Sequence, residues 1–194
     1  MSDDFFRFML LGLMAVFFPF AFYHRLRSNT GEKLDRWQEG KFIMFGLRLG
    51  AIPFVAGSLL WLLDPTRMAW TSFPFPAWLR CGALVAVGCG GLLLVWAFHN
   101  LGSNLTDTVV TRHSHTLITT GPYRYVRHPF YVAVFLAAVA GSFAAANWFL
   151  LLSSTIPIGF LVARTRIEER KLVEKFGDDY REYLSNTGRF LPRF

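Results

Sequence analysis

A polar and aromatic run, residues 121–131, stands directly before a long apolar stretch and holds groups that could bind a charged ligand. Pro129 suits the first turn of a helix, because that position needs no amide donor, so His128 is expected at the helix entrance. Free amides at such an entrance can hold a carboxylate or a phosphate. Ring faces for a cation or an adenine come from Tyr123, Tyr125 and Tyr131. The same run also fits an interfacial belt of Tyr and Arg residues beside a membrane helix.

A second charged cluster follows the last long apolar stretch and consists of Arg164, Arg166, Glu168, Glu169 and Arg170. Arg164 and Glu168 are four residues apart and can share a helix face, whereas Glu169 diverges somewhat. An arginine at a membrane boundary can orient a carboxylate through two hydrogen bonds, and a glutamate can accept them from an amine or a ribose hydroxyl. A plain surface salt bridge between Arg164 and Glu168 is the alternative explanation.

The elements that must position these residues are apolar enough to lie in a membrane. Apolar residues make up 53% of the 194, and 17% are aromatic, which is more than one soluble core can bury. Four long stretches contain very few ionisable groups, namely residues 8–23, 42–63, 77–98 and 130–162. We therefore predict an integral membrane protein.

These stretches predict an all-α, polytopic membrane protein with about five transmembrane helices. The first three helices are expected over residues 5–23, 42–63 and 77–98. The fourth stretch is too long for one span and is divided near Asn147, so it predicts a hairpin of two short helices. After Arg164, apolar residues recur at helical spacing among charges, which predicts a C-terminal amphipathic helix that covers the site.

The formal charge of +7 belongs mainly to loops beside the apolar stretches, where basic residues fix orientation and meet anionic lipid. The bilayer is therefore the expected partner, and nucleic acid is not. The loop after the first helix is basic, which predicts an N-terminus outside and a cytoplasmic C-terminus and active site. Arg48 lies within the second apolar stretch and is either a snorkelling side chain or a functional residue.

We expect a single membrane domain, residues 1–194, made of two halves. Residues 1–98 supply three N-terminal transmembrane helices, and residues 99–194 hold both runs that could carry chemistry. No metal is expected, because His113 and His115 have no Cys or carboxylate spaced to complete a site. No glycine-rich loop follows a predicted strand, so a doubly wound nucleotide-binding fold is not indicated.

Three consecutive features over about residues 100–194 together resemble the isoprenylcysteine carboxyl methyltransferase family and its prokaryotic relatives. They are the run GPYRYVRHPFY, an apolar hairpin, and the run RTRIEERKLVEKFGDDYREYLSNTGRFLP. Members of that family are membrane enzymes that bind S-adenosylmethionine in a cytoplasmic pocket formed by this loop, the hairpin and the C-terminal segment. The resemblance implies that Arg164 and Glu169 are catalytic. It also implies a cofactor pocket lined by Tyr123, Arg127, His128, Pro129, Tyr131 and Glu168.

The expected activity is transfer of a methyl group from S-adenosylmethionine to a lipid-like or prenylated acceptor at the membrane interface, with carboxyl O-methylation as the main expectation. Two alternatives stay open. One is a phospholipid N-methyltransferase, whose members resemble this chain in an Arg-His-Pro region and a Glu pair, and the other is a noncatalytic membrane scaffold. The enzyme interpretation requires His128 and Glu169 to lie close together on one side of the membrane.

Overall fold

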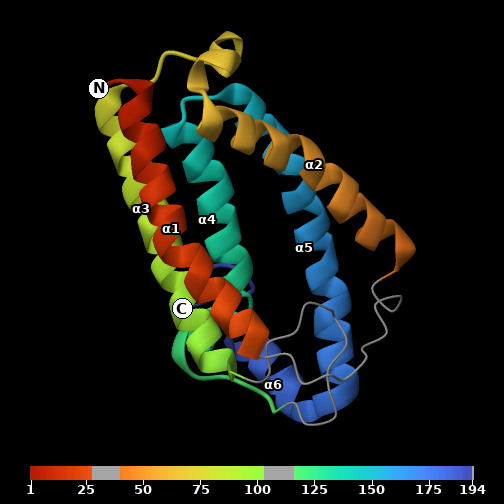
Figure 1. Cartoon of the computed structure of the whole chain (residues 1–194). Coiled ribbons are helices and arrows are strands. Elements are labelled where there is room, and N and C mark those ends of the chain that lie inside the picture. Colours follow the sequence, from red (N-terminus) through yellow and green to blue (C-terminus); the bar gives the residue numbers. More distant parts are fainter. Residues whose placement is uncertain (28–39, 103–115, 194) are drawn as a thin grey trace.

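The computed structural model describes residues 1–27, 40–102 and 116–193, and these residues fold into a bundle of helices (Figure 1). The α-helices are α1 (Asp3–Arg27), α2 (Lys41–Leu63), α3 (Ala77–Leu101), α4 (Pro129–Ala144), α5 (Trp148–Phe176) and α6 (Asp178–Asn186). Two 3₁₀ segments, η2 (Pro65–Thr71) and η4 (Gly121–Arg124), precede α3 and α4. Within the described residues, β-pairing is limited to two isolated bridges. The predicted all-α class is confirmed.

Four of these helices, α1, α2, α3 and α5, are long and apolar enough to cross a membrane. The fifth apolar helix, α4, has 16 residues and is about 24 Å long. The long helices expose large apolar side chains such as Phe8, Phe18 and Phe42, as expected for surfaces that face lipid rather than water. The chain is therefore a multi-pass membrane protein, and α1, α2 and α3 begin and end within a few residues of the predicted bounds.

The turn between α4 and α5 lies where Asn147 predicted it. The Asn147 side chain caps α5 by accepting a hydrogen bond from the Leu150 amide at 3.0 Å. Its side-chain nitrogen donates to Thr71 Oγ1 at 2.6 Å, and both residues are fully buried. Thr71 ends η2, so the two connections at this end of the bundle are fastened to each other.

The charged segment after Arg164 does not form a separate amphipathic helix. Instead, α5 continues through it as one helix of 29 residues, about 43 Å long. That length exceeds the hydrocarbon layer of roughly 30 Å, so the charged half of α5 extends beyond the layer. Gly177, with φ +59°, ends α5 and leads into α6. The predicted amphipathic pattern is therefore divided between the end of α5 and α6.

Glycines let two pairs of helices approach closely. On α3, a Cβ atom built on Gly90 would lie 3.1 Å from Leu136 Cβ and 3.2 Å from the Ala133 carbonyl oxygen of α4. On α2, Gly57 faces Phe149 of α5 in the same way. As a result α1, α3 and α4 lie together, and α2 and α5 form the other side of the bundle (Figure 1). This packing brings the C-terminal ends of α3 and α5 and the N-terminal end of α4 to the same end of the molecule.

Filling the contact at Gly90 should destabilise the bundle. We expect Gly90→Leu to lower the free energy of unfolding by about 1–3 kcal/mol, because the new side chain must push α3 away from α4. Gly82→Leu is the matched control, since Gly82 lies on the same helix and a Cβ there meets nothing within 4 Å. Thermal unfolding in detergent measures both, and equal midpoints for the two variants would contradict this account of the packing.

Candidate functional site

The candidate site begins where the chain enters α4. Pro129 is the first residue of that helix, and His128 precedes it with a non-helical backbone (φ −125°, ψ 60°). The His128 carbonyl accepts a hydrogen bond from the Tyr131 amide at 3.1 Å. His128 and Tyr131 are buried, and their rings stack with centroids 5.4 Å apart. The prediction that Pro129 opens a helix with His128 at its entrance is confirmed.

The C-terminal end of the described chain lies against this entrance. After α6, residues 187–190 run beside residues 126–128, and we call residues 187–190 the C-terminal strap. The Arg127 amide donates to the Gly188 carbonyl at 2.9 Å, and the His128 amide donates to the Arg189 carbonyl at 3.1 Å. A parallel bridge joins Val126 to Gly188. These bonds place the side chains of the strap next to those of the α4 entrance.

Glu169 of α5 is the centre of the polar cluster and is only 7% exposed. Its Oε1 atom accepts a hydrogen bond from Arg127 Nε at 3.0 Å and lies 3.2 Å from His128 Nε2. Arg189 of the strap donates to both carboxylate oxygens, with its Nε 3.1 Å from Oε1. The α4 entrance, the charged end of α5 and the strap therefore meet at one buried carboxylate.

Glu168 reaches the same place from the preceding position of α5. The Tyr131 hydroxyl donates to its Oε1 at 2.6 Å, and His128 Nδ1 lies 3.5 Å from its Oε2. Arg164 Nε, one helical turn earlier, lies 3.4 Å from Glu168 Oε1. The structure thus pairs Arg164 with Glu168, its neighbour on the helix face, and His128 lies between the two carboxylates.

Arg127 is fastened into the protein by several hydrogen bonds and is only 11% exposed. Besides its bond to Glu169, its Nη1 donates to the carbonyls of Leu184 at 2.8 Å and Thr187 at 2.7 Å. These carbonyls lie at the C-terminal end of α6, where backbone carbonyls have no amide partner within the helix. Arg127 therefore holds α6 and the strap in place while it compensates the charge of Glu169.

Two tyrosines tie α6 to the segment before α4. The Tyr183 hydroxyl donates to the Tyr123 carbonyl oxygen at 2.6 Å. Burial raises the pKa of the Tyr123 and Tyr183 phenols, so both stay protonated at neutral pH. Tyr125 is different: it is 53% exposed, and its ring lies 6.3 Å from Trp96. Tyr125 therefore points away from the cluster.

Sequence reasoning gave no chemical role to Arg189. Arg189 follows α6 in a segment without periodicity, so no pattern indicated the direction of its side chain. Arg166 and Arg170, which belong to the predicted charged cluster, are exposed, and so is Arg48 of α2. In the described parts of the chain, no group of three His, Cys, Asp or Glu residues could hold a metal. The histidines at 113 and 115 lie outside the described residues.

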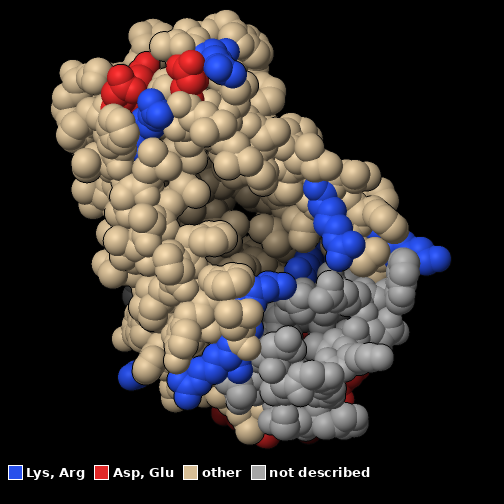
Figure 2. Space-filling model, viewed as in Figure 1, with Lys and Arg blue, Asp and Glu red and all other residues tan. Residues whose placement is uncertain are grey.

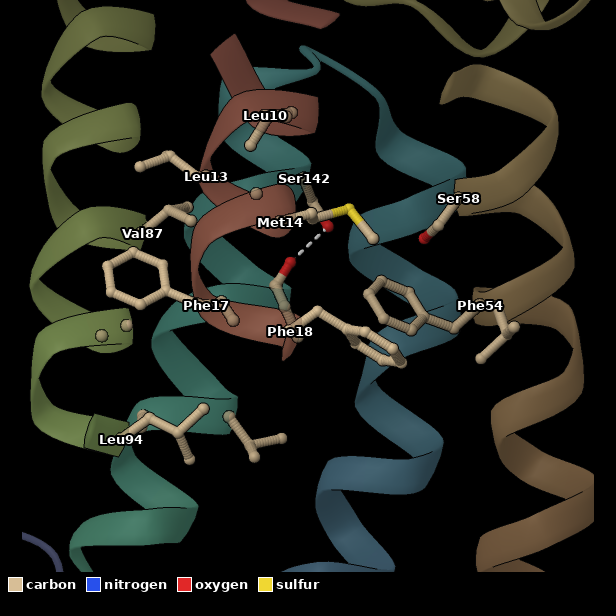
Figure 3. A pocket seen from close by; sticks show the side chains of 18 of the residues that line it. Leu10, Leu13, Met14, Phe17, Phe18, Phe54, Ser58, Val87, Leu94 and Ser142 are labelled. Atoms are coloured by element: carbon tan, nitrogen blue, oxygen red, sulfur yellow. Dashed lines mark hydrogen bonds between the residues drawn. The ribbon is translucent and has the colours of Figure 1, made fainter. Parts of the chain in front are cut away.

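A large apolar cavity of about 500 Å³ lies inside the bundle and is lined by all five apolar helices (Figure 3). Along α4 and its C-cap it extends from Phe130 to Ala145, a distance of about 22 Å. Its lining is apolar apart from two serines, Ser58 and Ser142, and one tryptophan indole. The hollow opens among uncharged side chains on one face of the molecule (Figure 2). The cavity lies next to the polar cluster, because Phe130, which lines it, has its ring centroid 5.4 Å from that of Tyr131.

Comparison with known proteins gives a consistent result for the second half of the chain. Residues 83–174 match the model of the isoprenylcysteine carboxyl methyltransferase family. Human protein-S-isoprenylcysteine O-methyltransferase is 32% identical over 126 residues, which cover 63% of this chain and 44% of the human protein. The Schizosaccharomyces pombe protein of the same name is 34% identical over 116 residues, 58% of this chain and 49% of that protein. The chain therefore spans about half the length of these relatives, or less.

A second kind of enzyme and a solved structure also match. Methanethiol S-methyltransferase of Pseudomonas deceptionensis is 38% identical over 71 residues, 36% of this chain and 26% of that protein. The structure of a eukaryotic intramembrane Ras methyltransferase, isoprenylcysteine carboxyl methyltransferase, aligns with a TM-score of 0.53 at 21% identity. The alignment covers 79% of this chain and 53% of that chain. The match indicates that the two proteins share a membrane fold.

Removing the Arg127 guanidinium should loosen the site and α6 together. We expect Arg127→Met to lower the free energy of unfolding by about 1–3 kcal/mol, since Glu169 loses one of its two guanidinium partners and the Leu184 and Thr187 carbonyls lose a donor. The α6 segment should also become sensitive to protease. Arg181→Met is the matched control, because Arg181 is 63% exposed and pairs only with Asp178 among the described ion pairs. Thermal unfolding and limited proteolysis measure both effects, and equal stability of the two variants would contradict the proposed role of Arg127.

Proposed function

Because residues 83–174 match the model of the isoprenylcysteine carboxyl methyltransferase family, we propose that this chain is a membrane methyltransferase of that family. Its methyl donor is S-adenosylmethionine, and its acceptor is lipophilic and carries the reactive group at its polar end. The observation that supports this best is that a long apolar cavity and a buried charged cluster are neighbours at the entrance of α4, where Phe130 lines the cavity and Tyr131 belongs to the cluster. In this proposal the charged cluster binds the water-soluble cofactor, and the cavity binds the apolar chain of the acceptor.

The groups of the cluster suit the chemistry of the cofactor. Its amino-acid end needs a cation for the carboxylate and a hydrogen-bond acceptor for the ammonium. The cluster offers both, because the guanidinium groups of Arg127 and Arg189 flank the carboxylate of Glu169. Its adenine and sulfonium suit aromatic faces, and His128 and Tyr131 stack beside the carboxylates. The cofactor pocket in this proposal is lined by Tyr123, Arg127, His128, Pro129, Tyr131 and Glu168.

The cofactor supplies a methyl group that is already activated, so the protein mainly positions the acceptor and excludes water. In this proposal Arg164 orients the acceptor, and Glu169 helps to place it or the cofactor. Arg164 is suited to this role because it stands on α5 one turn before Glu168 and is 11% exposed. A guanidinium in that position holds a planar carboxylate better than a lysine would.

The surroundings of Glu169 favour a carboxylate acceptor over an amine. Methylation of an amine requires a base to remove a proton, whereas methylation of a carboxylate does not. Glu169 accepts hydrogen bonds from Arg127 and Arg189 and lies beside His128. A carboxylate with two guanidinium partners has little tendency to take a proton. We therefore keep carboxyl O-methylation as the main proposal, with the S-methyltransferase relative as a reason to include thiols among the acceptors tested.

The distribution of charge supports a cytoplasmic site. At the end of the bundle opposite the site, the described basic residues each pair with an acid: Arg7 with Asp4, Arg67 with Asp64, and Arg80 with Asp3. At the end that holds the cluster, basic residues occupy the last turn of α1, precede α4 and continue along the end of α5. Because Lys and Arg accumulate in cytoplasmic segments, we propose that this end is cytoplasmic and that the N-terminus is outside.

Transfer of a labelled methyl group tests the activity. The full chain in lipid nanodiscs, supplied with labelled S-adenosylmethionine, should methylate prenylcysteine analogues with a free carboxylate more rapidly than phosphatidylethanolamine or simple thiols. Arg164→Ala and Glu169→Gln should each lower turnover at least about a hundredfold, because both misplace the reacting groups. Normal rates in both variants would refute the roles assigned to these residues.

The control for these variants is Glu174→Gln on the same helix. Glu174 is 56% exposed and pairs with Lys171 on the surface, so its loss should leave turnover within about twofold of the wild type. Preferred methylation of phosphatidylethanolamine would instead favour a phospholipid N-methyltransferase. Binding of no cofactor at all would favour a noncatalytic scaffold.

Filling the cavity should impair binding of the acceptor without affecting the cofactor. Ser58→Trp places an indole among the cavity-lining residues of α2, and we expect it to raise the KM for a long-chain acceptor about tenfold or more while the affinity for S-adenosylhomocysteine is unchanged. Ile52→Trp is the matched control, because Ile52 lies on the same helix, is 57% exposed and does not line the cavity. Equal KM values for the two variants would show that the acceptor binds elsewhere.

A further inference from the structure

Arg189 differs from the other two arginines of the cluster in how its guanidinium is held. Arg127 is 11% exposed and is also bonded to two backbone carbonyls, and Arg164 is 11% exposed beside Glu168. Arg189 has a side chain that is 34% exposed. The hydrogen bonds described for that side chain all go to Glu169. Of these three guanidinium groups, Arg189 is therefore the one that a ligand arriving from water reaches most easily.

The backbone that carries Arg189 is fixed, although its side chain is accessible. The His128 amide donates to the Arg189 carbonyl at 3.1 Å. On one side, Gly188 lies so close to the Leu191 carbonyl oxygen that it leaves no room for a Cβ atom. On the other side, the ring of Phe190 lies 5.9 Å from that of His128. The guanidinium can thus change its partner while the strap keeps its position.

The charges of the cluster show what kind of partner fits. Arg127 already pairs with Glu169, and Arg164 with Glu168, so Arg189 is the cation beyond those that the two carboxylates need and can take a carboxylate from a ligand. An amino acid carries one carboxylate and one ammonium, and it matches an Arg–Glu ion pair group by group. If it separates Arg189 from Glu169, Glu169 still has Arg127 and His128, so no buried charge is left unpaired.

We propose that the ion pair between Arg189 and Glu169 opens to receive the zwitterionic amino-acid end of the cofactor, with Arg189 as the residue that recognises its carboxylate. The ammonium then takes the place of the Arg189 guanidinium at Glu169. This inference rests on the proposed function, because it takes the cofactor to be S-adenosylmethionine. It gives the C-terminal strap a binding role that lies outside the residues implied by the family resemblance.

Two thioethers that cannot donate a methyl group separate recognition of the amino-acid end from recognition of the adenosine. S-adenosylhomocysteine keeps the amino-acid end, and 5′-methylthioadenosine lacks it. Isothermal titration of the full chain in nanodiscs should show that the wild type binds S-adenosylhomocysteine more tightly than 5′-methylthioadenosine. Arg189→Gln should weaken that binding about tenfold to a hundredfold, the range expected for losing a charged hydrogen-bonded pair. Binding of 5′-methylthioadenosine should change by less than about twofold.

Two further variants exclude a merely structural effect. Arg189→Lys keeps the charge but loses the planar fork, so its affinity for S-adenosylhomocysteine should lie between those of the wild type and Arg189→Gln. If Arg189→Gln does not fold, the affinity of Arg189→Lys for S-adenosylhomocysteine is the measurement that tests the proposal. Arg193→Gln is the matched control, because Arg193 donates to the Ser185 carbonyl at 2.7 Å on the exposed surface, and it should bind both thioethers as the wild type does.

The outcomes distinguish the inference from the function on which it rests. Equal losses for both thioethers in the Arg189 variants would make Arg189 a structural residue and overturn the inference, and so would unchanged affinity for both. A wild type that binds both thioethers equally well would also overturn the inference while leaving the proposed cofactor in place. A wild type that binds neither thioether would overturn the proposed function, and the inference would fail with it.

Discussion

Glu169 carries a charge that is almost completely removed from water, and such a charge needs cations and hydrogen-bond donors around it. Its own helix does not supply them in the structure. Arg127 and His128 come from the entrance of α4, and Arg189 comes from the strap after α6. The same Arg127 guanidinium also bonds the last carbonyls of α6. One buried carboxylate therefore joins three segments that are distant in the sequence, and the arrangement of the whole C-terminal half depends on it.

The hairpin of α4 and α5 determines the position of this cluster along the helix axes. Arg164 is 16 positions after Trp148, the first residue of α5, so it lies about 24 Å along that helix. This distance equals the length of α4, whose 16 residues run in the opposite direction. Arg164 and Glu168 therefore arrive at the level of the first turn of α4, where Tyr131 bonds Glu168. Glu169 lies slightly further along, at the level of the loop that carries Arg127 and His128.

The sequence predicted those features that a single element determines. Long apolar stretches gave the spans, Asn147 gave the hairpin turn, and Pro129 gave the start of α4. The continuity of α5 was missed, because the change from apolar to charged residues at Arg164 looks like the end of a helix although helix-forming residues continue. Arg189 was missed because its direction is determined by backbone pairing with residues 126–128. Pairing of this kind, between short segments far apart in the chain, leaves no periodic pattern in the sequence.

The contact between apolar and polar regions follows from two neighbouring residues of α4. Successive side chains of an α-helix point about 100° apart, so Phe130 lines the cavity while Tyr131 bonds Glu168. In the proposal, an acceptor whose apolar chain occupies the cavity has its polar end near Phe130, beside Tyr131 of the cluster. Under the proposed carboxyl methylation, the acceptor arrives with a negative charge that a guanidinium can pair and leaves as a neutral ester. The reaction itself removes the ion pair that holds the acceptor at the cluster, so the product binds there more weakly than the acceptor and can return to the bilayer.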